Sequence, residues 1–398
     1  NLSGTRGQLK LEGNSSQTLF QLMGFNPDFI DEAYSLGVDI EGNLDSVSLT
    51  IDNATLGLSD VSGKILIKPG DTDQFDVELT SRRLHLPTFI PALISATDDK
   101  KDPIVVKDRV IPDFDLPWRY LSDIKLNFIH KAAKVDLQLD NHSSTELAFA
   151  IDDGRLHSQN ISWQSDKSDG TAVLVIDQSP EDKTNADIRF EISSERIPLL
   201  WLFTGTPVDV DGERLQFNAR FNSKGHSSAE VLKNLNGLVA FRGGGGVINT
   251  SKLDTLFGDF LLQLTRRVFS TAEKQTNVHC TGSAFSITNG KILFDPVLAV
   301  RTSRFDILAT GEINLPNEAL KLQINSRSRQ GIGVSAVSSL VPRVGVVGTL
   351  AKPQVQVSAT ETAISSGAAI ASSGLSILAS GLWDRLRSSV ENPCDAVY

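Results

Sequence analysis

The amino-acid sequence predicts a mostly β protein, folded as a long antiparallel meander with one apolar face. In many segments apolar residues recur at every second position, which places them on one side of a strand. Pairs that favour tight turns, such as Asp153-Gly154, Asp211-Gly212 and Asn289-Gly290, separate many of these segments. Segments with helical periodicity are few, so strands dominate the prediction.

The alternating segments run through most of the chain. The pattern starts at residues 47–51 and returns at 75–79, 124–128, 135–139, 147–151, 188–192, 215–217, 285–287, 320–324 and 355–357. Asp, Glu, Lys, Ser, Gln or Asn occupy the intervening positions, which predicts a polar opposite face. The common alternation predicts that one shared concavity is lined by Phe75, Val77, Leu79, Val135, Leu137, Phe149, Ile188, Phe190, Ile192 and Phe217.

The strongest helical pattern is an amphipathic helix at residues 251–269. Ser251 and Asp254 fit an N-terminal capping box. One face of this helix carries Leu253, Leu256, Phe257, Phe260, Leu261 and Leu264. We expect this stripe to pack on the sheet and to close part of the concavity as a gate. Ordinary core packing is the alternative interpretation.

Other helices are expected to be short, except at the C-terminus. Residues 17–23 and 228–234 favour short helices, and residues 363–387 favour a terminal helix. In that last segment Gly367, Gly374 and Gly381 stand seven apart, which leaves a stripe where another backbone can approach. The six serines and three glycines among residues 363–383 argue against a membrane span.

The domain organisation follows from shifts in composition and from internal similarity. Residues 1–95 and 118–224 are predicted to be two β-repeats, separated by a charged, proline-containing linker or inserted loop at residues 96–117. Residues 225–398 form a third region.

Two pairs of segments echo one another along the chain. Residues 75–84 align with 188–197, and residues 13–20 resemble 225–232. The offsets differ, which favours diverged repeats with insertions, with chance similarity between amphipathic strands as the alternative.

Composition and motifs exclude several classes of function. Lys plus Arg number 38 and Asp plus Glu number 48, a net charge of −10 that disfavours nucleic-acid binding. Two cysteines cannot build a four-thiolate zinc site, and the six histidines are scattered without an H-E-x-x-H motif. No G-x-S-x-G motif occurs. We therefore expect no enzyme activity, no cofactor and no metal. The glycine run Gly243–Gly246 is predicted to be a strand-to-helix turn rather than an anion-binding loop.

Residues 277–360 resemble the C-terminal region of the AsmA family of bacterial envelope proteins. The matching pieces are the strand that ends in Asn289-Gly290, the stretch Gly311-Glu-Ile-Asn-Leu, and the stretch Gly348-Thr-Leu-Ala-Lys-Pro. Residues 36–87 are similar to the family's repeat, and residues 225–268 are similar to the section before its C-terminal region. The resemblance covers most of the chain.

The resemblance implies an elongated, strongly curved antiparallel β-sheet that forms a hydrophobic groove, with a few short helices and a C-terminal helix. Family members lie in the periplasm, anchored to the inner membrane through an N-terminal segment absent from this chain. They are thought to carry phospholipid acyl chains toward the outer membrane without catalysis. The implied partners are therefore phospholipid acyl chains and the inner and outer membranes, with no nucleic acid.

Two other functions stand beside this one. One is a structural or chaperone-like envelope protein that assists outer-membrane assembly, in which the apolar face is only core. The other is a β-rich secreted enzyme acting on polysaccharide, which needs paired acidic groups.

The resemblance also bears on the two cysteines. The periplasm is oxidising, so we expect a Cys280–Cys394 disulfide that pins the terminal helix to the end of the sheet. Two unpaired buried thiols are the alternative.

Overall fold

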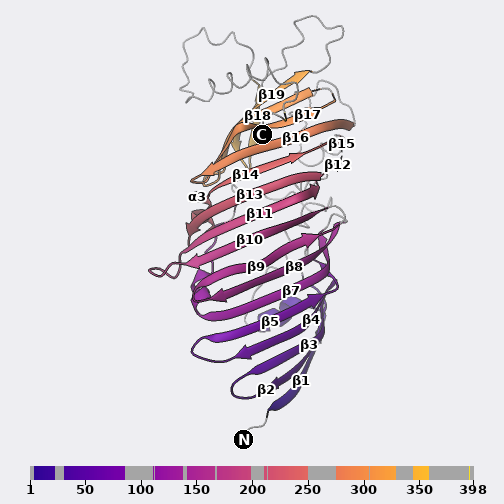
Figure 1. Ribbon diagram of the computed structural model, residues 1–398, viewed down its shortest axis with the longest axis vertical. Coiled ribbons are helices and arrows are strands. Elements are labelled where there is room, and N and C mark those ends of the chain that lie inside the picture. Colours follow the sequence, from indigo (N-terminus) through magenta and orange to yellow (C-terminus); the bar gives the residue numbers. More distant parts are fainter. Residues whose placement is uncertain are drawn as a thin grey trace, which may run out of the picture. The chain divides into compact units, whose positions relative to one another are not determined.

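The described part of the chain is mostly β, which confirms the predicted fold class (Figure 1). The computed structural model describes residues 4–22, 31–85, 111, 113–137, 141–165, 168–198, 210–212, 214–249, 275–303, 305–328, 344–357 and 394. The chain divides into two compact units. Unit 1 comprises Asn1–Lys101, Asp115–Arg196 and Lys224–His226, and unit 2 comprises Asp102–Phe114, Ile197–Ser223 and Ser227–Tyr398.

The strands of unit 1 pair mostly with their neighbours in the sequence. They are β1 (Thr5–Gly13), β2 (Tyr34–Gly42), β3 (Val47–Leu56), β4 (Ser59–Lys68), β5 (Asp73–Ser81), β6 (Leu84–His85), β7 (Ile124–Leu137), β8 (Asn141–Asp152), β9 (Arg155–Gln164), β10 (Asp169–Gln178) and β11 (Ala186–Pro198), whose last two residues belong to unit 2. Antiparallel pairing joins β1 to β5 in order, and β7 to β11 in order.

The pairing of β7 with β5 and β6 departs from the predicted antiparallel meander. Both pairings are parallel, with Phe75 opposite Leu126 and Leu84 opposite Val135. The reason lies in the connection, because residues 82–123 separate β5 from β7 and a parallel partner needs a long crossover. Elsewhere in unit 1 the sequential strands are joined by short connections that favour antiparallel pairing, except β1 and β2, which are antiparallel across a longer connection that contains α1.

Two of the three predicted turn pairs are confirmed. Asp153 and Gly154 have φ of 49° and 75°, and Asn289 and Gly290 have 47° and 70°. Such paired positive φ values belong to the two-residue hairpin turns that Asp-Gly and Asn-Gly favour. The turn predicted at Asp211-Gly212 is wrong, because both residues lie in β12 and pair with β15. Cross-strand pairing outweighs the local turn preference there.

Unit 2 is built around the long strand β16. Its strands are β12 (Val210–Gly212), β13 (Arg214–Gly225), whose last two residues belong to unit 1, β14 (Asn236–Gly243), β15 (Gly246–Asn249), β16 (Gln275–Thr288), β17 (Lys291–Thr302), β18 (Phe305–Asn314), β19 (Ala319–Ser328), β20 (Val344–Thr349) and β21 (Pro353–Val357). Both β14 and β15 pair with one edge of β16, and β17–β21 continue from its other edge as an antiparallel meander.

The glycine run Gly243–Gly246 is not the predicted strand-to-helix turn. Gly243 ends β14 and Gly246 begins β15, so the run joins two strands that share one partner. Glycine tolerates the irregular backbone that such a break in a strand requires.

The two short predicted helices are present as α1 (Ser16–Leu22) and α3 (Ser228–Lys233). They begin in the same way, since Ser15 Oγ accepts the Thr18 N–H and Ser227 Oγ accepts the Glu230 N–H, each at 3.3 Å. An aspartate outside each helix accepts a second N–H of the first turn. Asp31 accepts the Gln17 N–H, and Asp113 accepts the Ala229 N–H. The echo of residues 13–20 in 225–232 is therefore also an echo in structure.

Several predicted features lie outside the described residues. These are the helix at 251–269, with its proposed gate, the helix at 363–387, and most of the linker at 96–117. Among the helices of the described residues, none is both long and apolar enough to cross a membrane. The other described helix is the 3₁₀ helix η2 (Trp118–Ser122).

Candidate functional site

The strands of unit 1 place apolar side chains beside one another in rows that cross the sheet. Residues opposite each other in paired strands point to the same face, so the register decides which side chains share it. β5 contributes one predicted lining residue to each of three rows: Phe75 to the first, Val77 to the second and Leu79 to the third. We call this side of the unit 1 sheet the apolar face.

The three rows are defined by the pairing register. The first row is Val47, Ile67, Phe75, Leu126, Ile151, Leu156, Ile176 and Ile188. The second row is Ile40, Leu49, Ile65, Val77, Phe128 and Phe149, continued by the pair Leu174 and Phe190. The third row is Leu9, Val38, Ile51, Gly63, Leu79, His130, Leu147 and Ile161, continued by the pair Ala172 and Ile192.

Part of the first row is covered by η2. Leu121 of η2 forms a buried cluster with Ile151, Ile176 and Ala186. Two predicted lining residues, Phe149 and Ile188, pack against this cluster. At these two positions the apolar face is packed as ordinary core, which is what the alternative of a structural or chaperone-like protein predicts.

The second and third rows combine buried and partly exposed side chains. Val38, Val77 and Ala172 are buried, Leu9 is 42% exposed, and Leu79, Phe190 and Ile192 are partly exposed. In the second row Phe128 and Phe149 stack, with ring centroids 4.8 Å apart. Within the described part of unit 1, no second sheet lies over these rows.

The register brings most of the predicted lining residues together. In unit 1 it places Phe75, Val77, Leu79, Phe149, Ile188, Phe190 and Ile192 in the three rows. Val135 follows a bulge in β7 and is 4% exposed, and the side chain of Leu137 lies outside the described residues. Phe217 belongs to unit 2, where it stands opposite Phe241. The apolar face is defined for unit 1 alone, so the place of Phe217 in one shared concavity stays a prediction.

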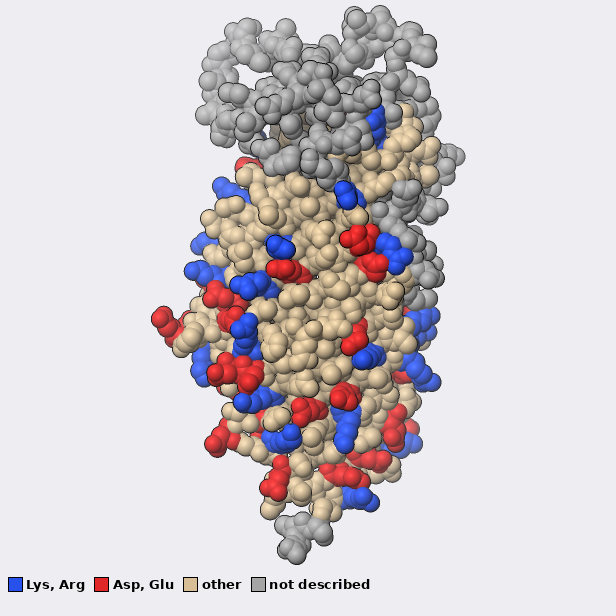
Figure 2. Space-filling model, viewed as in Figure 1, with Lys and Arg blue, Asp and Glu red and all other residues tan. Residues whose placement is uncertain are grey.

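The opposite face of the unit 1 sheet is charged. Cross-strand ion pairs join Arg6 to Glu41, Lys131 to Glu146, and Arg155 to Asp177. On the face in view in Figure 2, positive and negative side chains of the described residues are interspersed, without a broad patch of one sign. Exposed ion pairs of this kind add little to the free energy of unfolding, but their charges make this face of the sheet favourable to solvate.

His130 is one of the third-row residues that were absent from the predicted lining. It continues the alternation two residues after Phe128, and that spacing is the signal that points to it. Its Nε2 lies 2.9 Å from Ser81 Oγ, and its row neighbours are Leu79 and Leu147. Burial lowers the pKa of His130 below its ordinary value of 6.5, so the imidazole is neutral at neutral pH.

Beyond the third row lies a fourth, which we call the rim row. It consists of Ser81, Ala132, Thr145, Trp163 and Gly170. A concavity of about 800 Å³ is lined by all five of these residues together with polar neighbours such as Lys131, Glu146 and Ser162. Register shifts occur in β7, β9 and β11 near this row, and the concavity is lined by side chains from alternate positions.

The Trp163 indole occupies space that is open only because its register partner, Gly170, has no side chain. A Cβ at Gly170 would lie 2.1 Å from Trp163 Cζ2 and 2.8 Å from the Ser193 carbonyl oxygen. We therefore expect Gly170→Ala to displace the indole and to lower the free energy of unfolding by about 1–3 kcal/mol. Urea unfolding followed by Trp fluorescence measures both effects. The control is Gly7→Ala in β1, where nothing lies within 4 Å of the added Cβ; equal losses in the two variants would contradict the expectation.

Unit 2 also has an apolar side. Ile287, Ile292, Ile313 and Leu320 stand in one cross-strand row. On the same side the rings of Phe285 and Phe294 lie 5.0 Å apart.

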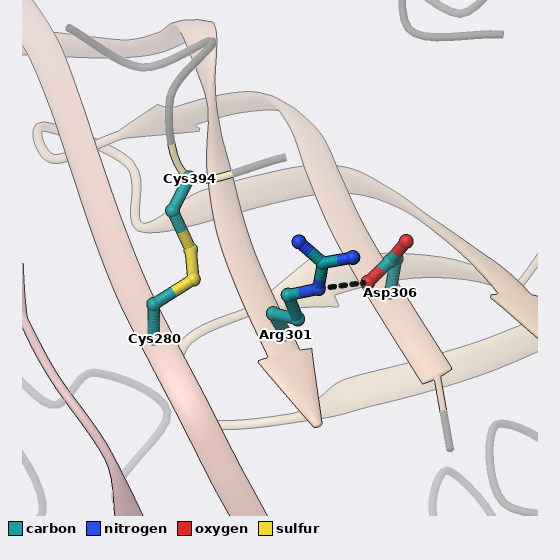
Figure 3. Close-up of a disulfide and its surroundings, with 4 residues drawn as sticks. All are labelled: Cys280, Arg301, Asp306 and Cys394. Carbon is teal, nitrogen blue, oxygen red and sulfur yellow. Dashed lines mark ion pairs between the residues drawn. A yellow bond between two sulfur atoms is a disulfide. The ribbon is translucent and has the colours of Figure 1, made fainter. Parts of the chain in front are cut away.

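The disulfide lies on the other side of the unit 2 sheet. Cys280 stands opposite Arg301, and Arg301 stands opposite Asp306, so these three side chains share one side of the sheet (Figure 3). Thr281, the next residue along β16, points to the apolar side. The structure contains the Cys280–Cys394 disulfide, with 6.4 Å between the Cα atoms. Arg301 Nε lies 3.5 Å from Asp306 Oδ1 beside it, and both Asp306 and Cys394 are buried. Cys394 is thus held on the side opposite the apolar row.

Within the described residues, no group of three His, Cys, Asp or Glu side chains is placed to hold a metal ion. Comparison with protein-family models, characterised proteins and solved structures found no match to this chain.

Proposed function

We propose that this chain is a non-enzymatic lipid-transfer protein of the AsmA type, which carries phospholipid acyl chains along its apolar β-surface in the periplasm, between the inner and outer membranes. The observation that carries the proposal is the set of partly exposed apolar rows in unit 1. Each strand from β1 to β5 and from β7 to β11 contributes to these rows. The sequence resemblance described above supports the same function.

The energetics of acyl chains explain why continuity matters. Burying an acyl chain is worth about 0.8 kcal/mol per CH₂, or roughly 12 kcal/mol for a chain of about 16 carbons. If one strand lacked an apolar residue, the acyl chain would lose much of this burial free energy at that strand, and the loss would be a barrier to sliding. The second row has an apolar side chain on each of β2–β5, β7 and β8 without interruption. Such a path suits a chain that moves from strand to strand.

A second candidate is a structural or chaperone-like envelope protein. The packing of Phe149 and Ile188 against the η2 cluster favours it, because there the apolar face serves as core. Under this alternative lipid does not touch the second and third rows. Site-specific capture of lipid separates the two candidates.

Photo-crosslinking provides that test. We expect benzoyl-phenylalanine at Phe75 or Phe190 to capture phospholipid, because both positions are partly exposed on the apolar face. The matched controls are Glu78 and Arg189, which are exposed on the same strands but on the opposite face. Mass spectrometry of the purified chain detects the adducts. Equal capture at all four positions, or at none, would contradict lipid transfer along this face.

A further inference from the structure

The apolar face changes in character from the first row to the rim row. The first row is wholly aliphatic and aromatic and is partly covered by η2. The third row contains His130, and the rim row contains Ser81, Thr145 and Trp163. An amphiphile with its chains toward the first row would therefore place its polar linkage near the third row and the rim row.

Two hydrogen-bond donors stand at this polar border. The Trp163 Nε1–H is buried and has no hydrogen-bond partner among the described residues. Buried polar groups are nearly always paired, so an unpaired indole N–H needs an explanation. His130 has Ser81 as its one hydrogen-bond partner in the described part of the chain. When Ser81 donates to Nε2, the imidazole proton sits on Nδ1 and that N–H remains available.

The kind of ligand follows from the charge of these donors. Apart from His130, the three rows contain no ionisable side chain. Lys131, which lines the concavity together with Trp163, is already paired with Glu146 at 3.5 Å. The His130 imidazole is neutral at neutral pH because burial lowers its pKa. Neutral donors beside a lysine that is already paired suit a neutral carbonyl oxygen better than a phosphate.

We propose that His130 and Trp163 form a recognition site for the ester carbonyls of a bound lipid, so that the protein selects ester-linked over ether-linked chains. The inference rests on the proposed function and names the chemical group that this face recognises. Ser81 orients the His130 ring, and Gly170 leaves room for the Trp163 indole. The acyl chains then lie on the first and second rows.

The test compares two phosphatidylethanolamines with chains of equal length, one ester-linked and one ether-linked. Each competes with lipid capture by a photo-crosslinker at Phe190, which lies outside the proposed recognition site. We expect the ester lipid to compete better by about two- to tenfold for each hydrogen bond. Trp163→Phe, which keeps the ring but removes the N–H, and His130→Leu should each reduce this preference. His130→Gln, which keeps a donor, should retain it.

The control variant is His157→Leu, which removes an imidazole from the opposite face of β9. It should keep the full preference. Equal competition by both lipids in the unaltered chain would overturn the recognition site while leaving lipid binding intact. An unchanged preference in both Trp163→Phe and His130→Leu would also overturn it. Competition by neither lipid would overturn the proposed function and this site together.

Discussion

Replacing both cysteines, as Cys280→Ser with Cys394→Ser, is expected to lower the free energy of unfolding of unit 2 by about 4–5 kcal/mol. The disulfide joins residues 114 positions apart, so its loss frees a long loop in the unfolded chain. It also releases Cys394, which is buried on the sheet side that carries Arg301 and Asp306. Urea unfolding of the double variant and of the unaltered chain measures the difference.

Reductant supplies the control for this experiment. Reducing the unaltered chain should bring its unfolding midpoint down to that of the double variant, whereas reductant should leave the double variant unchanged. The prediction fails if the double variant unfolds at the same urea concentration as the oxidised chain. Free thiols in the oxidised chain, found by mass spectrometry, would contradict the disulfide itself.

A charge in the third row is expected to have the largest effect on lipid transfer. Leu79→Glu removes an apolar side chain from the apolar face and sets a carboxylate beside Gly63 and His130. Losing the apolar contact of one leucine with the bound lipid, together with desolvation of the new charge, predicts a fall in transfer rate of about ten- to hundredfold. Transfer of fluorescent phospholipid between vesicles measures the rate.

The adjacent residue provides a matched control. Thr80→Glu adds the same charge to the same strand, but Thr80 is exposed on the opposite face. It should leave the transfer rate within about twofold of the unaltered chain, since an exposed charge changes little. Similar rates for the two variants, with both folded by circular dichroism, would remove the apolar face from the transfer path.

Much of the local structure was predictable from the sequence. Alternation identified β3, β5, β8 and β11, because a half-buried strand needs an apolar residue at every second position. The turns at Asp153-Gly154 and Asn289-Gly290 followed from residues that accept positive φ. The same alternation assigned Phe75, Val77, Leu79, Phe190 and Ile192 to one side of their strands. These features depend on neighbours within a few residues, which a single sequence displays directly.

Only the tertiary structure decided which strands meet. It made β7 a parallel partner of β5, drew Asp211-Gly212 into a strand, and placed Phe217 in a different unit from the other predicted lining residues. It also brought Ser81 to His130 and Gly170 beneath Trp163. Each of these contacts joins residues on different strands, and its register depends on connections and bulges elsewhere in the sheet. Periodicity assigns a side chain to a face, but the choice of partner strand depends on pairing free energies that local sequence does not contain.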